Sequence, residues 1–408
     1  MRRLADTYGS WCVQAFNGFS AVGDDEGPVP IGGLVIGNPP TAGKTTVLIV
    51  GGLHGREWVP PDALLSFAEK LLVAKKTQAA ITYPSFVCAG VTYATGPDST
   101  GPAYVVTAQA VSDIVDRFRL VIVPVVNPDG RLFSLTQRDQ HVTDQLWRKN
   151  RRNHTPGACL GVDINRNFPI AWQREVFYTV AAEPRARISK EPCSPVFRGP
   201  SPQSEPETQA LQKFVEDYDP AAFVDVHMSG RNISFPWGVE TNQNTDSAQW
   251  FGNPAHDRNP ATQTGGRDGL EFAGYGEYMP TALGDRLKAI GDGMAAEIRA
   301  SAGASLLAQT RSVYTVSQSA GIDGEFKTFP GSADDFVFSR QFSDSERDPD
   351  KCVAFLIECG IAAGQNPDNP EEDEGEFAPD YDKVYPKIER EVHAALFGLL
   401  KHPSWVVP

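Results

Sequence analysis

The chain has 408 residues, of which 41% are hydrophobic, so it is long enough to bury a large core within a single domain. No run approaches the roughly 18 uninterrupted apolar residues that a membrane-spanning helix needs. The formal net charge of −14 at pH 7 argues against nucleic acid as a partner, because phosphate binding needs a basic face, whereas a negative field attracts cationic substrates.

Apolar runs typical of strands alternate with helical patterns along the chain. Strands are expected at residues 34–36, 46–50, 120–126, 222–226 and 353–357. Helices are expected at residues 61–75, 106–118, 205–217, 278–301 and 385–401. The alternation predicts an α/β fold: one domain over residues 1–408, with a mixed, mostly parallel central sheet and helices on both faces.

Long surface loops are expected where Gly, Pro, Asn, Ser and Thr accumulate, namely near residues 93–103, 173–202 and 238–274. Loops of this length tend to be functional, so we expect them to form the rim of the site and to select substrates. The acidic run at residues 371–376 is expected to be a solvated loop, with a calcium site as the alternative.

Polar residues follow three of the expected strands. His54 and Glu57 come just after the apolar run that ends at Leu53, His227 closes the strand at 222–226, and Glu358 closes the strand at 353–357. In open α/β sheets the carboxyl ends of the strands open into one crevice, so these side chains are expected to meet there. A His-x-x-Glu pair alone is common by chance, and a histidine at a strand end often only caps a loop. Two histidines, one glutamate and a second acid are nevertheless a set that catalytic zinc uses.

Four motifs in the middle of the chain carry a family resemblance. They are Asn-Pro-Asp-Gly at residues 127–130, Trp-Arg-Lys-Asn-Arg at 147–151, Gly-Val-Asp-Ile-Asn-Arg-Asn-Phe at 161–168 and Ser-Glu-Pro-Glu-Thr at 204–208. In this order, and together with the four polar residues above, they resemble the zinc carboxypeptidases of the carboxypeptidase A/B type. The similarity extends from about Val47 to the C-terminus.

The resemblance implies a metal site and two catalytic groups. One Zn²⁺ would be held by His54, Glu57 and His227, and Glu358 would take a proton from the attacking water and pass it to the leaving amine. Arg148 would polarise the scissile carbonyl and stabilise the oxyanion. Without the resemblance, Arg148 would be assigned to a solvated basic patch.

The resemblance also implies four substrate-binding residues. Asn165 and Arg166 would hold the free C-terminal carboxylate, which a planar guanidinium recognises well. Arg56 would contact more distant substrate residues. Asp334 falls at the position of the pocket for the C-terminal side chain, where a carboxylate would favour Lys or Arg; the alternative is that Asp334 only caps a turn.

One departure from the family concerns a mobile tyrosine that closes over the substrate. An ungapped alignment on the Asp335-Phe336 pair places Lys327 at that position. Tyr314 could substitute only if the loop is differently folded. We expect the loss to change affinity rather than to abolish activity.

The cysteines bear on the compartment. The resemblance implies a disulfide between Cys159 and Cys193, and such a bond would indicate an oxidising compartment. The other four are expected to be buried free thiols: Cys12, Cys88, Cys352 and Cys359. The opening residues show no apolar core of a signal peptide, and the family's inhibitory pro-domain is not found. We expect a secreted or periplasmic protein whose leader is absent from this chain, and a cytoplasmic location stays open.

The sequence therefore predicts a monomeric zinc exopeptidase that acts on the C-termini of peptides or proteins. Two alternatives are kept. One is a zinc-dependent deacylase or amidohydrolase on the same scaffold, for which the carboxylate clamp would also serve. The other is a catalytically silent relative that binds peptides.

Overall fold

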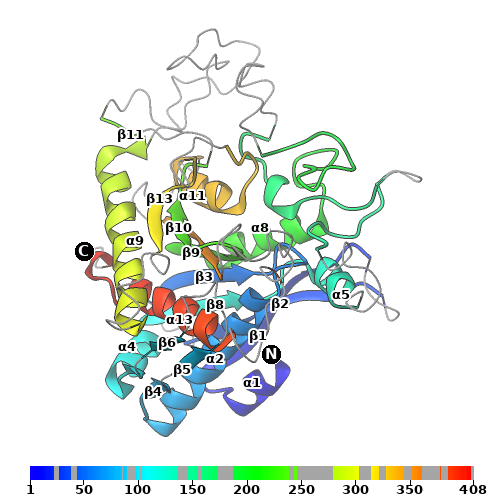
Figure 1. The fold of residues 1–408 in the computed structure, drawn as a ribbon. Coiled ribbons are helices and arrows are strands. Elements are labelled where there is room, and N and C mark those ends of the chain that lie inside the picture. The colour runs from blue at the N-terminus through cyan, green and yellow to red at the C-terminus, as the bar shows by residue number, and fades with distance from the viewer. Residues whose placement is uncertain are drawn as a thin grey trace.

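In a computed structural model of the chain, a large mixed sheet organises the molecule (Figure 1). The structure describes residues 1–22, 27–37, 44–84, 86–89, 98–101, 103–136, 146–154, 159–172, 187–238, 243–245, 279–302, 314–320, 328–343, 352–360, 377 and 385–405. Within these residues, eight strands follow the order β1-β2-β8-β3-β9-β14-β10-β13. They are β1 Cys12–Phe19, β2 Pro30–Ile36, β3 Thr45–Gly51, β8 Phe118–Val123, β9 Ala222–Met228, β10 Asn232–Phe235, β13 Thr315–Gln318 and β14 Val353–Cys359.

The centre of the sheet is parallel, as the sequence predicts. Strand β3 pairs in parallel with β8 and β9, β9 pairs in parallel with β14, and β10 does so with β13. The remaining neighbours in this sheet are antiparallel. The side chains of Val47 to Val50 in β3 are fully buried, which is typical of a strand covered by helices on both faces.

Helices cover both faces of the sheet (Figure 1). On one face α13 packs against α9 and α2, and α2 packs against α4. On the other face α8 packs on β1 and β3, and α11 packs on β9 and β14. The described helices are α1 Arg2–Thr7, α2 Val59–Thr77, α4 Ala108–Arg117, α5 Pro128–Thr136, α8 Pro206–Tyr218, α9 Thr281–Ala302, α11 Ala333–Ser343 and α13 Tyr385–Lys401.

Helix α2 shows why the predicted helices form where they do. Pro60 and Pro61 occupy its first turn, where a missing backbone N–H costs nothing. Leu64, Leu71 and their neighbours make the buried stripe that packs on the sheet. The helix ends at Gln78, whose left-handed φ of 53° stops the helical path.

The described residues also form three two-stranded sheets beside the main one. They pair β4 Ile81–Tyr83 with β7 Tyr104–Val106, β5 Phe86–Ala89 with β6 Asp98–Gly101, and β11 Gln243–Asn244 with β12 Met279–Pro280. The stretch at 93–103 is therefore partly strand, because the pairing with β5 draws residues 98–101 into β6.

The other two expected loops are described only in part. Residues 187–202 contain no helix or strand beyond an isolated bridge between Ser189 and Phe197. Most of 238–274 and the acidic run at 371–376 lie outside the described residues.

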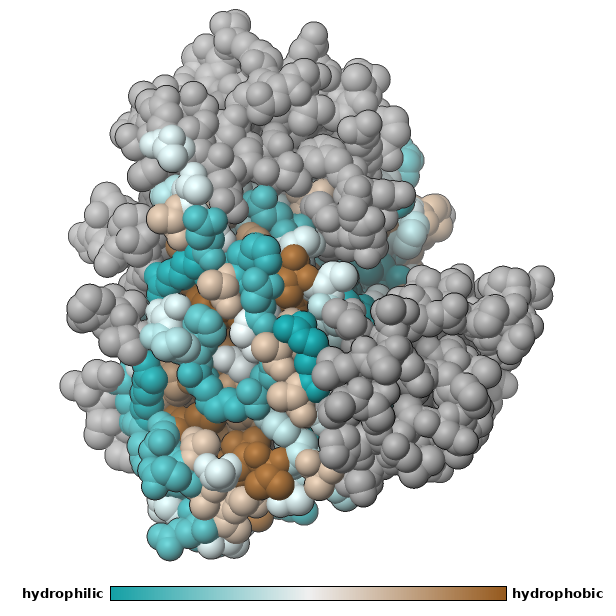
Figure 2. Space-filling model, turned by 60° about the vertical axis from the view of Figure 1, so that its left-hand side comes forward, coloured by the Kyte–Doolittle hydropathy of each residue, from teal (hydrophilic) through white to brown (hydrophobic). Residues whose placement is uncertain are grey.

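Among the described helices, none combines the length and the apolar character needed to cross a bilayer. On the face drawn in Figure 2, hydrophobic residues gather in small groups between hydrophilic ones.

Candidate functional site

The ends of three adjacent parallel strands bring the predicted metal ligands together. His54 and Glu57 lie in the loop that follows β3, where Gly52 adopts a φ of 63° that favours glycine. His227 lies near the end of β9, and its backbone pairs with that of Glu358 in β14. Because β3, β9 and β14 are neighbours in the sheet, the four side chains meet at one edge, as predicted.

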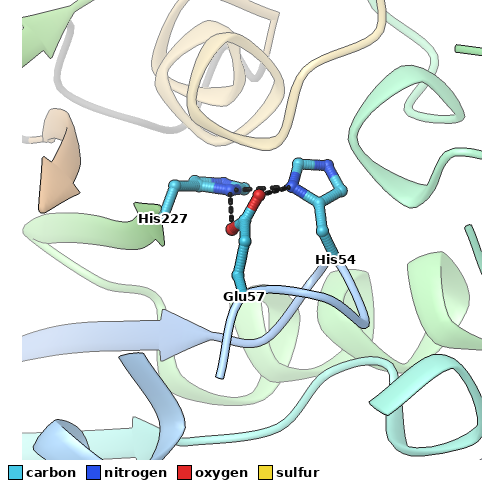
Figure 3. A group of neighbouring side chains, drawn as sticks. All are labelled: His54, Glu57 and His227. Carbon is cyan, nitrogen blue, oxygen red and sulfur yellow. Dashed lines mark hydrogen bonds and ion pairs between the residues drawn. The ribbon is translucent and has the colours of Figure 1, made fainter. Parts of the chain in front are cut away.

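Three side chains form a compact group of metal-binding atoms (Figure 3). One ligand atom from each of His54, Glu57 and His227 lies within 4.8 Å of the others, and all three residues are buried. Glu57 Oε1 is 2.5 Å from His54 Nδ1, and Glu57 Oε2 is 2.9 Å from His227 Nδ1. The two Nδ1 atoms are only 3.1 Å apart, a repulsive arrangement of lone pairs unless a proton or a cation lies between them. Two imidazoles and one carboxylate are a donor set that fits zinc.

Two further carboxylates orient the imidazoles. Asp163 Oδ1 is 3.2 Å from His54 Nε2, and Asp225 Oδ2 is 2.7 Å from His227 Nε2. A hydrogen bond at Nε2 fixes the tautomer that leaves Nδ1 free for a metal. In addition, the buried Glu57 is held ionised. Its burial alone would raise its pKa, but the two adjacent imidazoles outweigh that effect, so the pKa lies below the usual range.

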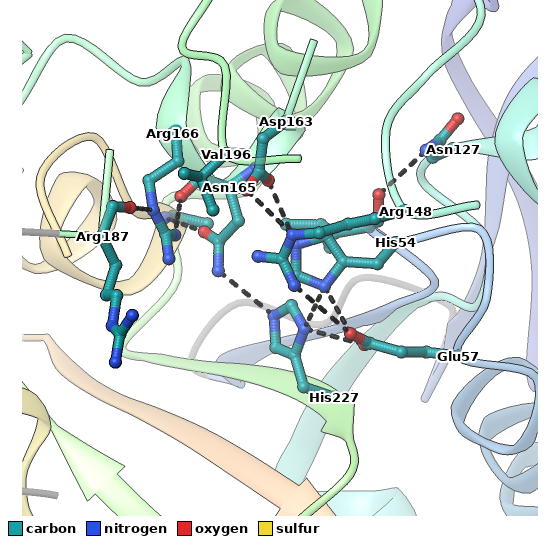
Figure 4. A network of polar contacts seen from close by, with 12 residues as sticks. His54, Glu57, Asn127, Arg148, Asp163, Asn165, Arg166, Arg187, Val196 and His227 are labelled. Atoms are coloured by element: carbon teal, nitrogen blue, oxygen red, sulfur yellow. Dashed lines mark hydrogen bonds and ion pairs between the residues drawn. The ribbon is translucent and has the colours of Figure 1, made fainter. Parts of the chain in front are cut away.

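Arg148 lies beside this group and not in a solvated patch (Figure 4). Its Nε donates to Asp163 Oδ2 at 2.9 Å, and its Nη1 lies 4.0 Å from Glu57 Oε1. Burial would raise the pKa of Asp163, but Arg148 and Arg166 outweigh it and hold that pKa well below its ordinary value. Asp163 therefore links His54, one of the predicted metal ligands, to the guanidinium of Arg148, which lines the same cavity.

Asn165 and Arg166 follow on a single turn of 3-10 helix, Ile164–Arg166. The backbone N–H of Ala333 donates to Asn165 Oδ1 at 2.8 Å, which leaves the amide nitrogen directed toward His227 Nε2, 3.4 Å away. Arg166 is buried, and burial lowers its pKa to about 10. Among the described residues, its hydrogen-bond acceptors are two backbone carbonyls, those of Asn165 and Arg187. A buried guanidinium without a hydrogen-bonded carboxylate is prepared to bind an anion.

Glu358 lies next to the metal-binding group. It is one of the residues that line a cavity of about 400 Å³ together with His54, His227 and Arg148. Burial raises its pKa to about 7. Its Oε2 atom is buried and has no hydrogen-bond partner among the described residues.

The same cavity extends to a wall rich in oxygen atoms. Asp334 lies in the first turn of α11, is buried, and accepts a hydrogen bond from Ser319 Oγ at 3.3 Å. Burial raises its pKa. Asn232 and Ser234 of β10 also line this wall. Within the described part of the chain, Asp334 Oδ1, Asn232 Oδ1 and Ser234 Oγ are buried without a partner.

Comparison with known proteins agrees with this geometry. The family model of the zinc carboxypeptidases matches residues 26–84 and 102–358. The chain belongs to the zinc carboxypeptidase family. Among its relatives, mast cell carboxypeptidase A of Rattus norvegicus is 30% identical over 189 residues, which are 46% of this chain and 34% of the relative. Carboxypeptidase O of Homo sapiens is 26% identical over 248 residues, 60% of this chain and 52% of the relative. The matches thus span about a third to a half of these relatives.

Solved structures of zinc carboxypeptidases share the fold. Carboxypeptidase A from Helicoverpa armigera superposes with a TM-score of 0.60 at 20% identity, over 99% of this chain and 72% of that one. The thrombin activatable fibrinolysis inhibitor gives a TM-score of 0.64 at 17% identity, over 100% of this chain and 72% of that one. The fold predicted from the sequence is therefore confirmed.

Three further residues considered in the sequence analysis are Arg56, Tyr314 and Lys327. Arg56 lines the cavity, and its guanidinium lies 4.0 Å from the centre of the Phe377 ring. Burial lowers the pKa of Arg56 to about 10. Tyr314 does not line the cavity; it is buried and donates to Glu391 of α13 at 3.2 Å, so it does not take the place of the family's tyrosine here. Lys327 lies outside the described residues.

The cysteine prediction is confirmed for one pair. Cys159 and Cys193 form a disulfide. Cys12, Cys352 and Cys359 are buried free thiols, and Cys88 is not among the residues whose side chains are described.

Proposed function

We propose that this protein is a zinc-dependent metallocarboxypeptidase that hydrolyses the C-terminal peptide bond of peptides or proteins. One observation carries the proposal. The three metal-binding residues form one buried group, and two of them, His54 and His227, line the same cavity as Glu358 and Arg166. A terminal carboxylate bound at Arg166 would direct the last peptide bond of a substrate toward Glu358.

Zinc held by His54, Glu57 and His227 would supply a Lewis acid and lower the pKa of water at its open position. The chain's own residues fit such an ion. Their donor atoms converge, and Asp163 and Asp225 fix the orientation of both imidazoles. Family membership supports the same metal.

We assign the proton transfers to Glu358. A base with a pKa near 7 accepts a proton from the attacking water at neutral pH and can return it to the leaving amine. Its Oε2 atom has no hydrogen-bond partner in the part of the chain that the structure describes, which leaves a lone pair for that proton. Arg148 supplies positive charge where the oxyanion develops, and Asp163 holds that guanidinium in place.

The substrate carboxylate would bind Arg166 and the amide nitrogen of Asn165. Arg56 would contact substrate residues further from the C-terminus, since it lines the same cavity. These assignments follow the family motif, and the burial of Arg166 supports them because a desolvated cation gains most from a bound anion.

A preference for basic C-terminal side chains is the finer part of the proposal. Asp334 contributes a buried carboxylate to the cavity wall, and Asn232 and Ser234 add unpartnered oxygen atoms. Buried acceptors without partners are costly, and the N–H groups of a Lys or Arg side chain would satisfy them. Relatives named carboxypeptidase B exist in the family, for example in Helicoverpa zea.

The decisive experiment combines metal content with release of amino acids from blocked dipeptides that end in Arg, Lys, Phe or Glu. We expect one zinc per chain, release of the last residue, and faster release of Arg and Lys than of Phe. Replacing Glu358 by Gln should lower turnover by about 10²–10⁴-fold while zinc stays bound. Glu391→Gln removes a buried carboxylate of α13 that contacts Tyr314, and it serves as the control for folding.

The outcomes separate this proposal from its alternatives. Hydrolysis of non-peptide acyl amides in preference to dipeptides would identify the deacylase or amidohydrolase. Peptide binding without hydrolysis would identify the silent relative, which is disfavoured because the ligands and Glu358 all lie together. A preference for Phe would reject the assigned role of Asp334.

We also propose that the protein acts in an oxidising compartment, either secreted or periplasmic, and as a monomer. The disulfide between Cys159 and Cys193 supports the compartment, because such bonds persist where thiols are not kept reduced. Its partners would be peptide or protein C-termini.

A further inference from the structure

A second arginine lies at the cavity of the proposed carboxylate site. Arg187 lines the same cavity as Asn165 and Arg166, but unlike Arg166 it is exposed to solvent. In Figure 4 its side chain extends away from the backbone carbonyl that contacts Arg166, and no dashed line reaches its guanidinium. No hydrogen bond or ion pair connects that guanidinium to any residue of the described part of the chain.

The backbone of Arg187 is fixed beside Arg166, the proposed anchor of the substrate carboxylate. Its carbonyl accepts from Arg166 Nε, and its N–H donates to the carbonyl of Thr328 at 2.8 Å. The ring of Phe329, the next residue, lies 5.3 Å from the Arg166 guanidinium carbon. The Cα atom of Arg187 therefore lies close to the anchor, and its long side chain can reach any anion bound there.

The anchor itself leaves room for another donor. Backbone carbonyls already occupy Arg166 Nε and Nη1, so only part of the guanidinium fork is available to a carboxylate. A carboxylate has two oxygens with about four lone-pair positions in total. Arg166 and the amide of Asn165 approach from the buried side, which leaves the solvent side for a mobile donor.

We propose that Arg187 is a substrate-binding residue that closes over the terminal carboxylate from the mouth of the cavity. This inference rests on the proposed carboxypeptidase function. Arg187 would thus contact the substrate carboxylate from the mouth of the cavity, and this contact would not require a tyrosine at position 327. Because Arg187 is exposed and its contact would form with the free carboxylate of any substrate, its effect belongs to binding and not to the choice of side chain.

The test uses Arg187→Met, which removes the charge and keeps an unbranched stem, and Arg187→Lys, which keeps the charge. We expect Arg187→Met to raise KM by about tenfold, as for one charge-assisted hydrogen bond near the surface, and to leave kcat nearly unchanged. Arg187→Lys should recover part of the loss. Lys190→Met removes the same charge three residues further on, at an exposed position outside the cavity lining, and should leave KM unchanged.

A binding measurement separates this inference from the proposed function. In the Glu358→Gln background, calorimetry compares an acylated amino acid that has a free carboxylate with its amide. Arg187→Met should weaken binding of the acid about tenfold and leave binding of the amide unchanged. Because the contact is exposed, added salt should reduce the difference.

Three results would overturn the inference. The first is an unchanged affinity for the acid in Arg187→Met when Arg166→Met weakens it. The second is a loss confined to substrates that end in Glu, which would mean that Arg187 binds the side chain. The third is a rise in KM for Lys327→Met without one for Arg187→Met. If the wild-type enzyme releases no amino acid, the proposed function fails, while the comparison of acid with amide still reports on Arg187.

Discussion

Replacement of Asp163 by Asn tests the role of a carboxylate that contacts three parts of the site. Asp163 Oδ1 is 3.2 Å from His54 Nε2 and accepts from the backbone N–H of Asn165 at 3.0 Å, and its Oδ2 accepts from Arg148 Nε at 2.9 Å. Asn keeps the size and one oxygen. It removes the negative charge and places an amide N–H₂ against another N–H donor, that of Arg148.

The expected magnitude follows from these contacts. Loss of a carboxylate that orients a metal-binding imidazole costs roughly 10–100-fold in metal affinity or activity. Displacement of a group that stabilises the oxyanion costs roughly 10²–10³-fold in kcat. Because one retained oxygen can still accept from His54 or Asn165, we expect the lower end of both ranges. At saturating zinc, kcat should fall about 100-fold, equivalent to about 2.7 kcal/mol in the activation barrier.

Two measurements check this expectation. Competition with a chelator gives the zinc Kd, and steady-state kinetics at saturating zinc give kcat and KM. Glu391→Gln, which removes a buried carboxylate paired with Lys387 of α13, is the matched control and should change neither. An Asp163→Asn enzyme with wild-type zinc affinity and kcat would refute the reasoning.

Two further predictions concern pH and backbone conformation. Burial raises the pKa of Glu358 to about 7, and a bound cation would lower it. Because the base becomes protonated as pH drops below neutrality, kcat/KM should fall there. A profile of kcat/KM that stays flat down to about pH 5 would contradict this prediction. Gly331 has a φ of 76°, and an added Cβ would lie 2.4 Å from the carbonyl oxygen of Arg166. Gly331→Ala should therefore lower the free energy of unfolding by about 1–3 kcal/mol in urea titrations and raise KM. Gly9→Ala is the control: its Cβ would meet nothing nearer than 3.4 Å, so the free energy of unfolding and KM should both stay unchanged.

The sheet and its main helices could be predicted because their signals are local. Strand β3 is a continuous apolar run, and α2 combines an apolar stripe with prolines in its first turn. Helices α5 and α11 were not predicted, since each is short and begins in a segment that resembles a turn, at Pro128 and Ala333 respectively. The β6 strand has no clear strand signal in the sequence, because the Asp and Gly at its two ends are poor strand formers.

The residues proposed to bind the metal could be selected for a different reason: each follows a recognisable strand. Asp225 carried a usable signal, because it lies two residues before His227 on the same face of β9. Arg187 carried no such signal, and Asp163 carried none beyond its place within the family motif at residues 161–168. Their roles depend on contacts between segments far apart in the chain, such as Asp163 with His54, and no local pattern encodes such contacts.

The pairing of His227 with Glu358 across β9 and β14 limits how the proposed site could change during evolution. Hydrogen-bonded neighbours in a sheet are held at a spacing of roughly 4.8 Å, which no loop rearrangement alters. The separation between a proposed metal ligand and the proposed base is thus set by sheet geometry. Insertions in the loops around the cavity, even long ones, can alter which molecules enter it, while the distance between His227 and Glu358 stays the same.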